Sequence, residues 1–433
     1  MKKNDRFIGV CTGYNVDGLG VVKHDGLVFF VKNVLRGEEV EVVVTAMKKT
    51  YGFGHCVRHL TVSNHRQEVQ CDIYKLCGGC HLQHMDKEEQ CYFKRQKVVD
   101  CFASIAKMTP NVVEVLDMDS PYRYRNKVQV PIQLVNDEVK MGFYRNHSHD
   151  IIEFEDCLVQ TKCSNKIVHR MKALLKEYQV ASNFRHIVIK HSHNTDEVMV
   201  VWVVREYPFK FVEELKEKLM SEFSNIKSIV VNINQRNDNV VLSSDEVILT
   251  ESGQIKESLN DFYFNISSRS FYQINPIQTK VLYEKAMEYA TIKPEDIVVD
   301  FYCGTGTIGL FASQYVKKVI GVEIVPEAIA DAKVNAENNG INNIQFICAD
   351  AKDGSKEILK MGQKVDVVFV DPPRKGCDEE TLSAIVEMAP KKIVYISCDP
   401  STLARDCKLL KEWGYSVEEV QPVDMFPLTH HVE

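Results

Sequence analysis

A cysteine at the end of an apolar run is the first residue of this chain that could do chemistry. In VYISCDPSTLARD, Cys398 follows the run VYIS, and Asp399-Pro400 separates it from a helix-like segment. A thiol in this position has two interpretations. It is either a small apolar residue that closes the edge of a sheet, or a nucleophile directed into a cleft. The stretch by itself supports both interpretations.

A thiolate there would suit covalent catalysis on an electron-poor ring such as a pyrimidine. Carbon 5 of uracil or cytosine is too weak a nucleophile to accept a methyl group unaided. Addition of a thiolate to carbon 6 makes carbon 5 nucleophilic; after methyl transfer, a base must remove the carbon-5 proton before the enzyme is released. A candidate base is Glu433, the last residue of PVDMFPLTHHVE, close behind His430 and His431.

A glycine motif indicates a nucleotide-binding loop. In DFYCGTGTIGLFA, Gly304, Gly306 and Gly309 spell G-x-G-x-x-G between a strand and a helix, and Glu323 ends the next strand. A ribose-binding acid belongs near that place. The motif alone fits a nicotinamide-dependent dehydrogenase as well as an S-adenosylmethionine-dependent methyltransferase.

Three further acids favour the methyltransferase. Asp300 ends the first strand, where S-adenosylmethionine enzymes often place an acid, and Asp350 ends the third, where an acid can bind the adenine amine. Asp371 opens DPPR, and its two prolines would form a rigid lip over the reactive end of the cofactor. Enzymes that methylate exocyclic amines place an aromatic residue after DPP, so Arg374 indicates a different target atom.

These residues require a parallel sheet to bring them together. After Phe271, strands and helices alternate regularly, which predicts an α/β fold with a doubly wound sheet and helices on both faces. Asp371 and Cys398 would then follow neighbouring strands at the edge that forms the crevice. The expected strands are DIVVDFYC (296–303), KKVIGVEIV (317–325), IQFICAD (344–350), KVDVVFVDPP (364–373) and KKIVYISCDP (391–400).

The sequence before residue 271 predicts two other domains. Residues 1–60 alternate Val and Phe between Gly turns, which predicts a five-stranded β-barrel of the oligonucleotide-binding kind. Residues 61–270 predict an α+β domain that also holds a cysteine cluster, and residues 271–433 form the nucleotide-binding domain. Basic residues of the barrel that could face phosphate are Lys2, Lys3, Lys23, Lys48, Lys49 and Arg58.

The cysteine cluster predicts a metal site. Cys71, Cys77 and Cys80 lie in CDIYKLCGGCHLQH, and Cys157 is the preferred fourth ligand over Cys91, Cys101 and Cys163. Thiolate ligands suit zinc or an iron–sulfur cluster, and His81 and His84 keep a zinc site with three cysteines and one histidine open.

The bulk properties predict an ordinary globular chain in the cytoplasm. The chain has 433 residues, is 45% hydrophobic and contains 14 cysteines. No apolar run is long enough to span a bilayer, and the N-terminus lacks the apolar segment of a signal peptide, so we expect a cytoplasmic protein and no membrane partner. A net charge of −7 argues against broad nonspecific binding to nucleic acid but allows local basic faces.

Five motifs in order resemble the RNA uracil-5-methyltransferase family, which makes 5-methyluridine in ribosomal and transfer RNA. They are FYQINP, DFYCGTGTIGL, DPPRKG, SCDPSTLARD and FPLTHHVE. The N-terminal barrel resembles that family's TRAM domain, an RNA-binding module, so the resemblance covers essentially the whole chain. One departure is that family members usually continue past H-V-E into a final strand, whereas this sequence ends at Glu433.

The resemblance implies roles for individual residues. Cys398 would be the nucleophile and Glu433 the base, with S-adenosylmethionine as cofactor and RNA as partner. The matching cofactor-pocket positions are Gln273, Tyr302, Glu323 and Asp371, followed by Thr307 and Asp350. Many members carry a 4Fe-4S cluster at this cysteine spacing, with zinc as the alternative here. A barrel together with a cysteine cluster is typical of members that act on 23S ribosomal RNA, which we prefer to transfer RNA, and we expect a monomer.

Three other functions are compatible with part of the sequence. An RNA cytosine-5-methyltransferase would use the same chemistry, but those enzymes tend to place Thr or Pro before the cysteine, where this chain has Ser397. A nicotinamide-dependent iron–sulfur oxidoreductase would explain the glycines and the cysteine cluster but leaves Cys398 and DPPR unexplained. A non-catalytic RNA-binding factor would tolerate loss of Cys398.

Overall fold

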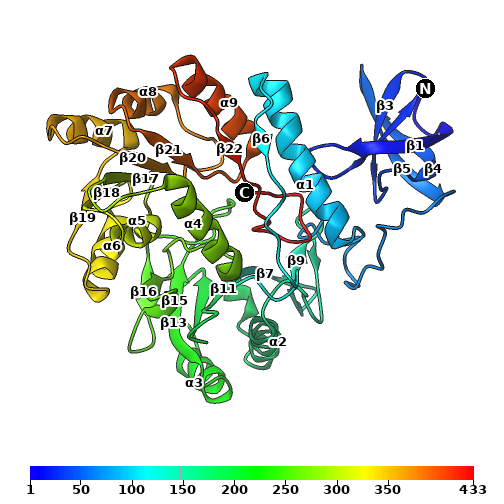
Figure 1. Cartoon of the computed structure of the whole chain (residues 1–433). Helices are drawn as coiled ribbons and strands as arrows, with labels where there is room; N and C mark the ends of the chain where they lie inside the picture. The colour runs from blue at the N-terminus through cyan, green and yellow to red at the C-terminus, as the bar shows by residue number, and fades with distance from the viewer. Residues whose placement is uncertain (147) are drawn as a thin grey trace. The chain divides into compact units, whose positions relative to one another are not determined.

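A computed structural model describes residues 1–146 and 148–433 of the chain. By their internal contacts these residues form two compact units. The first unit consists of Met1–Met118, Cys398–Lys408 and Ser416–Glu433, and the second of Asp119–Ser397 and Leu409–Tyr415. Figure 1 colours the chain from its N-terminus to its C-terminus, and each unit is described by itself below.

The first unit contains the predicted five-stranded barrel, which is closed in the order β1-β2-β3-β5-β4. Alternate residues point inward, as in β4, where Val40, Val42 and Val44 are fully buried. Gly52 and Gly54 take inward positions of β5 where a side chain has no room. The strands are β1 (Arg6–Tyr14), β2 (Gly20–His24), β3 (Leu27–Lys32), β4 (Glu39–Met47) and β5 (Tyr51–His59).

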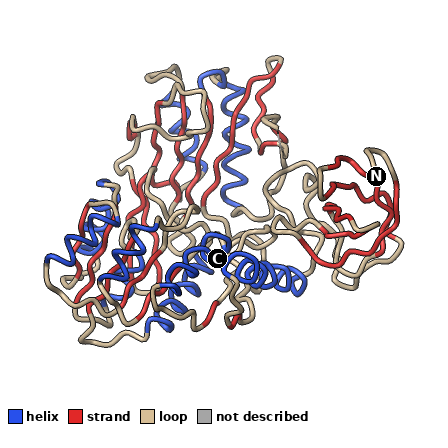
Figure 2. The backbone as a smooth tube through the Cα atoms, turned by 90° about the horizontal axis from the view of Figure 1, so that it is seen from above, coloured by secondary structure: helices blue, strands red, loops and turns tan. Residues whose placement is uncertain are grey.

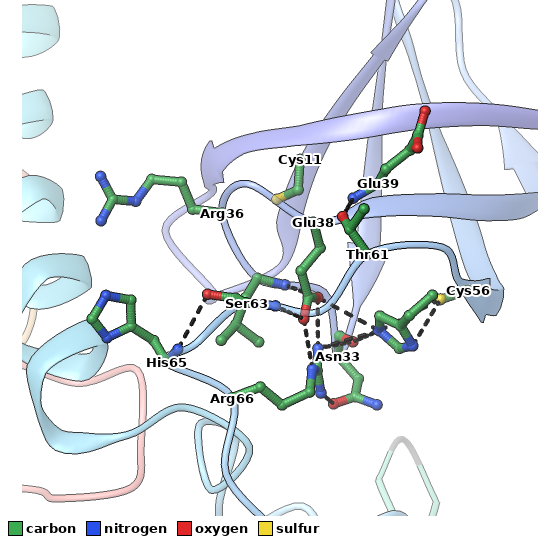
Figure 3. A network of polar contacts seen from close by, with 12 residues as sticks. Cys11, Asn33, Arg36, Glu38, Glu39, Cys56, Thr61, Ser63, His65 and Arg66 are labelled. Atoms are coloured by element: carbon green, nitrogen blue, oxygen red, sulfur yellow. Dashed lines mark hydrogen bonds and ion pairs between the residues drawn. The ribbon is translucent and has the colours of Figure 1, made fainter.

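A buried glutamate fixes the chain where it leaves the barrel (Figure 3). Glu38 is fully buried, and its carboxylate accepts hydrogen bonds from Arg66 at 2.7 and 2.8 Å. The backbone N–H groups of Leu35 and Ser63 donate to the same carboxylate at 2.8 and 3.2 Å. Burial alone would raise the pKa of Glu38, but the Arg66 guanidinium and these N–H groups hold that pKa below its usual value.

Helix α1 (Lys87–Cys101) is the central element of the remainder of the first unit. It begins at Asp86, whose side chain accepts a hydrogen bond from the backbone N–H of Glu89, and a π-helical turn, Phe102–Ala106, continues it. Two distant segments pair beside it, as β6 (Asn111–Val112) lies parallel to β22 (Glu419–Val420). Helix α9 (Pro400–Glu412) begins in this unit.

The second unit contains a six-stranded sheet in the order β14-β13-β12-β11-β7-β8, where only the β12–β13 pair is parallel. Helices α2 (Lys162–Glu177) and α3 (Val212–Glu222) accompany it. The strands are β7 (Lys127–Val135), β8 (Glu138–Met141), β11 (Phe184–His191), β12 (Val198–Val204), β13 (Ile226–Ile233) and β14 (Glu246–Ile248). Two small pairs are β9 (Phe143–Tyr144) with β10 (Ile151–Ile152), and β15 (Gln254–Leu259) with β16 (Phe262–Ser267).

The predicted doubly wound sheet is the other large sheet of the second unit. Its five strands are all parallel, in the order β19-β18-β17-β20-β21. They are β17 (Ile297–Phe301), β18 (Lys318–Glu323), β19 (Ile344–Cys348), β20 (Val367–Val370) and β21 (Lys392–Tyr395). Figure 2 shows the strands in red and the helices that flank them in blue.

Helices cover the sheet with small and apolar side chains. Ile358 of α7 and Ile385 of α8 join the core formed by the strands, while Gly309 lets α5 lie close to Val319 of β18. Helix α4 begins at Asn275, whose side chain accepts from the backbone N–H of Gln278. The helices are α4 (Pro276–Ala290), α5 (Thr307–Ser313), α6 (Pro326–Asn338), α7 (Ala351–Lys360) and α8 (Glu379–Glu387).

The fold class predicted from the sequence is therefore confirmed. The division into 1–60, 61–270 and 271–433 stays a prediction, since the compact units are built differently: the segment that ends at Glu433 belongs with the first 118 residues. None of the helices in the described ranges is both long and apolar enough to cross a membrane.

Candidate active site

Three acids meet at the carboxyl edge of the parallel sheet in the second unit. Asp300 lies in β17, Glu323 ends β18, and Asp371 follows β20 directly. Strand β17 pairs with both β18 and β20, and the chain reverses its direction of winding between them. Ligands of open α/β sheets bind at this point, because the loops on its two sides leave a crevice.

The glycine loop connects two of these acids to the backbone. Gly304 and Gly306 adopt φ angles of +53° and +82°, which residues with a side chain rarely adopt. The N–H of Gly304 donates to Glu323 Oε2 at 3.1 Å, and the N–H of Gly309 donates to Asp300 Oδ2 at 2.9 Å. The loop thereby fixes both carboxylates at the sheet edge.

The electrostatics of the edge favour a cation. Burial raises the pKa of Asp300 to about 8, and repulsion from Asp371 and Glu323 adds to this, although the bond from Gly309 opposes it. Burial also raises the pKa of Asp371 to about 7. The second carboxyl oxygen of Asp300, Oδ1, is buried without a hydrogen-bond partner. A ligand that carries an ammonium and a sulfonium group would fit, because it would satisfy this oxygen and lower both pKa values.

A buried tyrosine that the sequence did not single out joins the other predicted pocket residues. The Tyr283 hydroxyl lies 3.2 Å from Thr307 Oγ1. Burial, then the charge of Asp371, raises the pKa of Tyr283, while hydrogen bonds with Thr307 and Gln273 oppose that rise. Gln273, Thr307 and Asp371 therefore surround one side chain. Tyr283 lies inside an ordinary helix, so no local pattern marks it.

Two other predicted pocket residues have structural partners. Asp350 caps helix α7, as its side chain accepts from the backbone N–H of Lys352 at 3.1 Å. Tyr302 has a φ of +62°, and burial, then the neighbouring Cys377 thiol, raises its pKa. A role in cofactor binding stays a prediction for both Asp350 and Tyr302.

Cys398 lies in a strand-to-helix turn, as the sequence predicts. It follows β21 by three residues and precedes α9 by two, and it is partly buried. The side chain of Asp399 accepts a hydrogen bond from the backbone N–H of Ser401 at 2.8 Å. The backbone carbonyl of Asp399 accepts one from Thr402 Oγ1 at 3.0 Å. These bonds cap α9 and fix the turn that carries the thiol.

The C-terminal residue is anchored rather than frayed. Glu433 and Val423 exchange two backbone hydrogen bonds of 3.1 and 2.8 Å. Val432 is fully buried in a cluster that includes Val98 of α1 and Ala404 of α9. The backbone that carries the Glu433 carboxylate is therefore fixed by the interior of the first unit.

Three side chains of α1 bind the segment before Glu433. The Lys94 ammonium forms an ion pair with Asp424 and donates to the Phe426 carbonyl at 3.1 Å. One turn later, Lys97 donates to the His430 carbonyl at 2.9 Å. Gln90 Oε1 accepts from the N–H of Leu428 at 3.1 Å. Helix α1 thus holds the C-terminal segment, and no sequence pattern connects residues so far apart.

The structure gives no support to the metal site predicted at the cysteine loop. Among residues 1–146 and 148–433, no group of three or more His, Cys, Asp or Glu side chains is placed to hold a metal ion. Cys77 Sγ accepts from the N–H of Gly79 at 3.3 Å, and His84 is bonded to the Tyr74 hydroxyl at 2.8 Å. Cys157 belongs to the other unit. The side-chain arrangement therefore gives no support to a 4Fe-4S cluster or to zinc, and Cys71, Cys77, Cys80 and Cys157 stay predicted ligands.

Comparisons with known proteins identify the family. The family model "tRNA (Uracil-5-)-methyltransferase" matches residues 86–433. An RNA methyltransferase of Clostridium tetani is 44% identical over 100% of this chain and 96% of its own length. One from Clostridium acetobutylicum is 43% identical with the same coverage.

A solved structure shows the same fold over nearly the whole chain. The Pyrococcus abyssi tRNA (uracil-54, C5)-methyltransferase in complex with S-adenosyl-L-homocysteine has a TM-score of 0.77 and 27% identity, and the match covers 98% of this chain and 97% of the other. This match agrees with the electrostatics of the sheet edge, whose acids favour a cationic methyl donor. The chain belongs to the RNA uracil-5-methyltransferase family, whose members transfer the methyl group of S-adenosylmethionine to RNA.

Proposed function

We propose that the protein methylates carbon 5 of specific uridines in RNA, with Cys398 as the nucleophile and Glu433 as the base. The observation that carries the proposal is the anchoring of both residues in the first unit. The turn that holds Cys398 is capped by Asp399, and the backbone of Glu433 is paired with Val423. Both residues would act on the same covalent intermediate. The backbone of each therefore has to be held in place, because removal of the carbon-5 proton needs a positioned base.

The chemical steps follow from these two groups. Cys398 Sγ adds to carbon 6 of the uracil, and the electron pair of the 5,6 double bond becomes available at carbon 5. S-adenosylmethionine, when bound, would supply the methyl group that carbon 5 accepts and would leave as S-adenosylhomocysteine. The Glu433 carboxylate then takes the carbon-5 proton, the double bond re-forms, and the bond between sulfur and carbon 6 breaks. The thiolate is regenerated, and the proton remains on Glu433 until it passes to water.

The second unit supplies the residues for the methyl donor. Asp300 and Glu323, fixed by the glycine loop, would bind the amino group and the ribose, respectively. Gln273, Tyr302, Thr307, Asp350 and Asp371 complete the proposed set. Asp371 and its two prolines would limit access of water to the sulfonium end.

The proposed RNA is 23S ribosomal RNA. The resemblance described above supports it, because a barrel followed by a cysteine loop is typical of the ribosomal members. The neighbouring Pyrococcus abyssi enzyme acts on transfer RNA, so transfer RNA is the competing substrate. Mapping 5-methyluridine in ribosomal and transfer RNA from a strain that lacks the gene would decide between them: the missing position identifies the substrate.

A 4Fe-4S cluster at Cys71, Cys77, Cys80 and Cys157 is a separate proposal that rests on the resemblance alone. No step of the reaction above depends on it. Iron and acid-labile sulfide in protein purified without oxygen would support the cluster, whereas zinc or no metal would refute it. A cytoplasmic location and a monomeric state also stay predictions.

The nucleophile is tested by trapping. RNA that contains 5-fluorouracil should form a covalent complex with the protein, because fluorine cannot leave as a proton. Cys398→Ala should form none, whereas Cys348→Ala, which removes an exposed thiol at the end of β19, should react as the wild type does. An adduct that persists in Cys398→Ala would refute the assignment. Tritium release from labelled uracil rather than labelled cytosine in RNA would separate this activity from cytosine methylation.

A further inference from the structure

One outer face of the barrel carries three aromatic rings side by side. In β3, Phe29 and Val31 point inward, so Val28, Phe30 and Lys32 point outward. Strand pairing places Phe30 opposite Phe53 of β5, and Val28 opposite Tyr51. On the other side, Lys23 of β2 lies opposite Val28. Strands β2, β3 and β5 therefore present one continuous outer surface, here called the aromatic face, of Lys23, Phe30, Lys32, Tyr51 and Phe53.

The three rings form one cluster that remains partly exposed. Ring centroids are 5.5 Å apart for Phe30 and Tyr51, 5.9 Å for Phe30 and Phe53, and 5.7 Å for Tyr51 and Phe53. None of these side chains belongs to the buried core. Exposed aromatic residues on a sheet are costly unless a partner covers them, because their apolar surface stays in water.

Lysines surround the aromatic face. Lys23 and Lys32 are exposed at its two ends, and Lys48 and Lys49 are exposed in the turn that leads into Tyr51. The N–H of Lys48 donates to the Tyr51 carbonyl at 2.8 Å, which fixes this turn against the aromatic cluster. Positive charge around clustered aromatic rings complements a ligand that has flat bases and a phosphate backbone.

The opposite face of the barrel differs in chemistry. It is formed by β1 and β4, where the exposed residues include Ile8 and Val10 at 51% and 47% exposure. Two of its arginines are already paired with an acid, since Glu41 lies 3.2 Å from Arg6 and 3.6 Å from Arg58. Arg58, which the sequence suggested as a phosphate contact, is therefore on the side without aromatic rings.

We infer that the aromatic face binds unpaired RNA by stacking successive bases on Phe30, Tyr51 and Phe53, with Lys23, Lys32, Lys48 and Lys49 against the phosphates. The inference rests on the proposed RNA substrate. It adds which residues of the barrel contact the RNA, and that this RNA is single-stranded. A target uridine has to be unpaired or extruded before the thiol can reach carbon 6, so nucleotides beside it are available to stack.

The test measures binding of the full chain to a labelled, unstructured RNA of about 12 nucleotides by fluorescence anisotropy. Tyr51→Ser and Phe53→Ser should each weaken binding about 5-fold to about 150-fold, the loss expected for one stacked base. Tyr51→Phe and Phe53→Tyr, which keep the rings, should bind within about 2-fold of wild type. Ile8→Ser and Val10→Ser, matched exposed changes on the opposite face, should bind as wild type.

Direct cross-linking provides a readout that does not depend on a variant folding. Ultraviolet irradiation of the wild-type complex should join the RNA to peptides that contain Phe30, Tyr51 or Phe53. Cross-links confined to β1 and β4, no binding of the oligonucleotide, or equal weakening by Ile8→Ser and Tyr51→Ser would overturn the inference. Binding requires no methyl transfer, so a protein that stacks RNA here but forms no 5-fluorouracil adduct would refute the proposed function alone.

Discussion

The buried ion pair between Lys94 and Asp424 is one of the interactions that anchor the C-terminal segment. The side chain of Lys94 is 0% exposed and that of Asp424 is 7% exposed. Replacing Lys94 by Met keeps the apolar stem but leaves a buried carboxylate without its cation. Loss of one partner of a buried pair costs about 3–5 kcal/mol, whereas replacement of both by apolar residues is often close to neutral.

Lys94→Met should therefore lower the opening free energy of the first unit by about 3–5 kcal/mol, and Lys94→Met with Asp424→Leu should restore most of that loss. Lys87→Met is the matched control. Lys87 lies on the same helix and pairs with Asp117 at 2.9 Å, but its side chain is 53% exposed. An exposed pair contributes at most about 1 kcal/mol.

Hydrogen exchange under native conditions measures these free energies at the amides of α1 and of residues 424–433. If Lys94→Met exchanged no faster than Lys87→Met, or if the double substitution were as unstable as the single one, the account of the buried pair would be refuted.

A catalytic readout separates positioning of Glu433 from folding of the unit. A displaced Glu433 would leave the carbon-5 proton in place, so Lys94→Met should accumulate a methylated covalent complex with ordinary RNA, as Glu433→Gln should.

Three more predictions follow from charge and packing. Burial raises the pKa of the Asp300 carboxyl from an ordinary 3.8 to about 8, so this group destabilises the ligand-free protein as pH rises from about 4 to about 8. Binding of the cationic methyl donor should therefore release protons and strengthen over about pH 6 to 8 in calorimetry. Asp300→Asn should reduce this dependence and leave the part that comes from Asp371, whose pKa is about 7. Glu38 has a pKa below the ordinary value of 4.5, so the stability that this carboxylate provides is complete above pH 4.5 and is lost as pH falls through the pKa of the folded protein. Arg66→Met should therefore lower the melting temperature at about pH 7 and reduce this acid sensitivity. Gly54→Ala should destabilise the barrel by about 1–3 kcal/mol in urea unfolding, because the added Cβ would lie 2.3 Å from Val42 Cγ1; an unchanged midpoint would show that the strands move apart freely.

The sequence was sufficient for features that depend on neighbouring residues. Alternating Val residues between glycine turns indicated the barrel, and regular strand–helix alternation indicated the parallel sheet, because each pattern follows from the geometry of one element. The same holds for the turn at Cys398, since an apolar run followed by Asp-Pro ends a strand and begins a helix. Parallel strands end at a common edge, so the acids of that edge could also be placed from the sequence.

Other features depended on how distant segments pack. Lys94 and Asp424 are 330 positions apart, and neither residue carries a pattern that indicates the other. Tyr283 was missed for the same reason, as were the structural bonds of Asp350. The aromatic face arises from strand register, which places Phe30 beside Phe53 although the sequence separates them. Local patterns specify elements because neighbouring residues share one backbone geometry, whereas these contacts exist only after the elements pack, when burial makes each charge and each hydrogen bond require a partner.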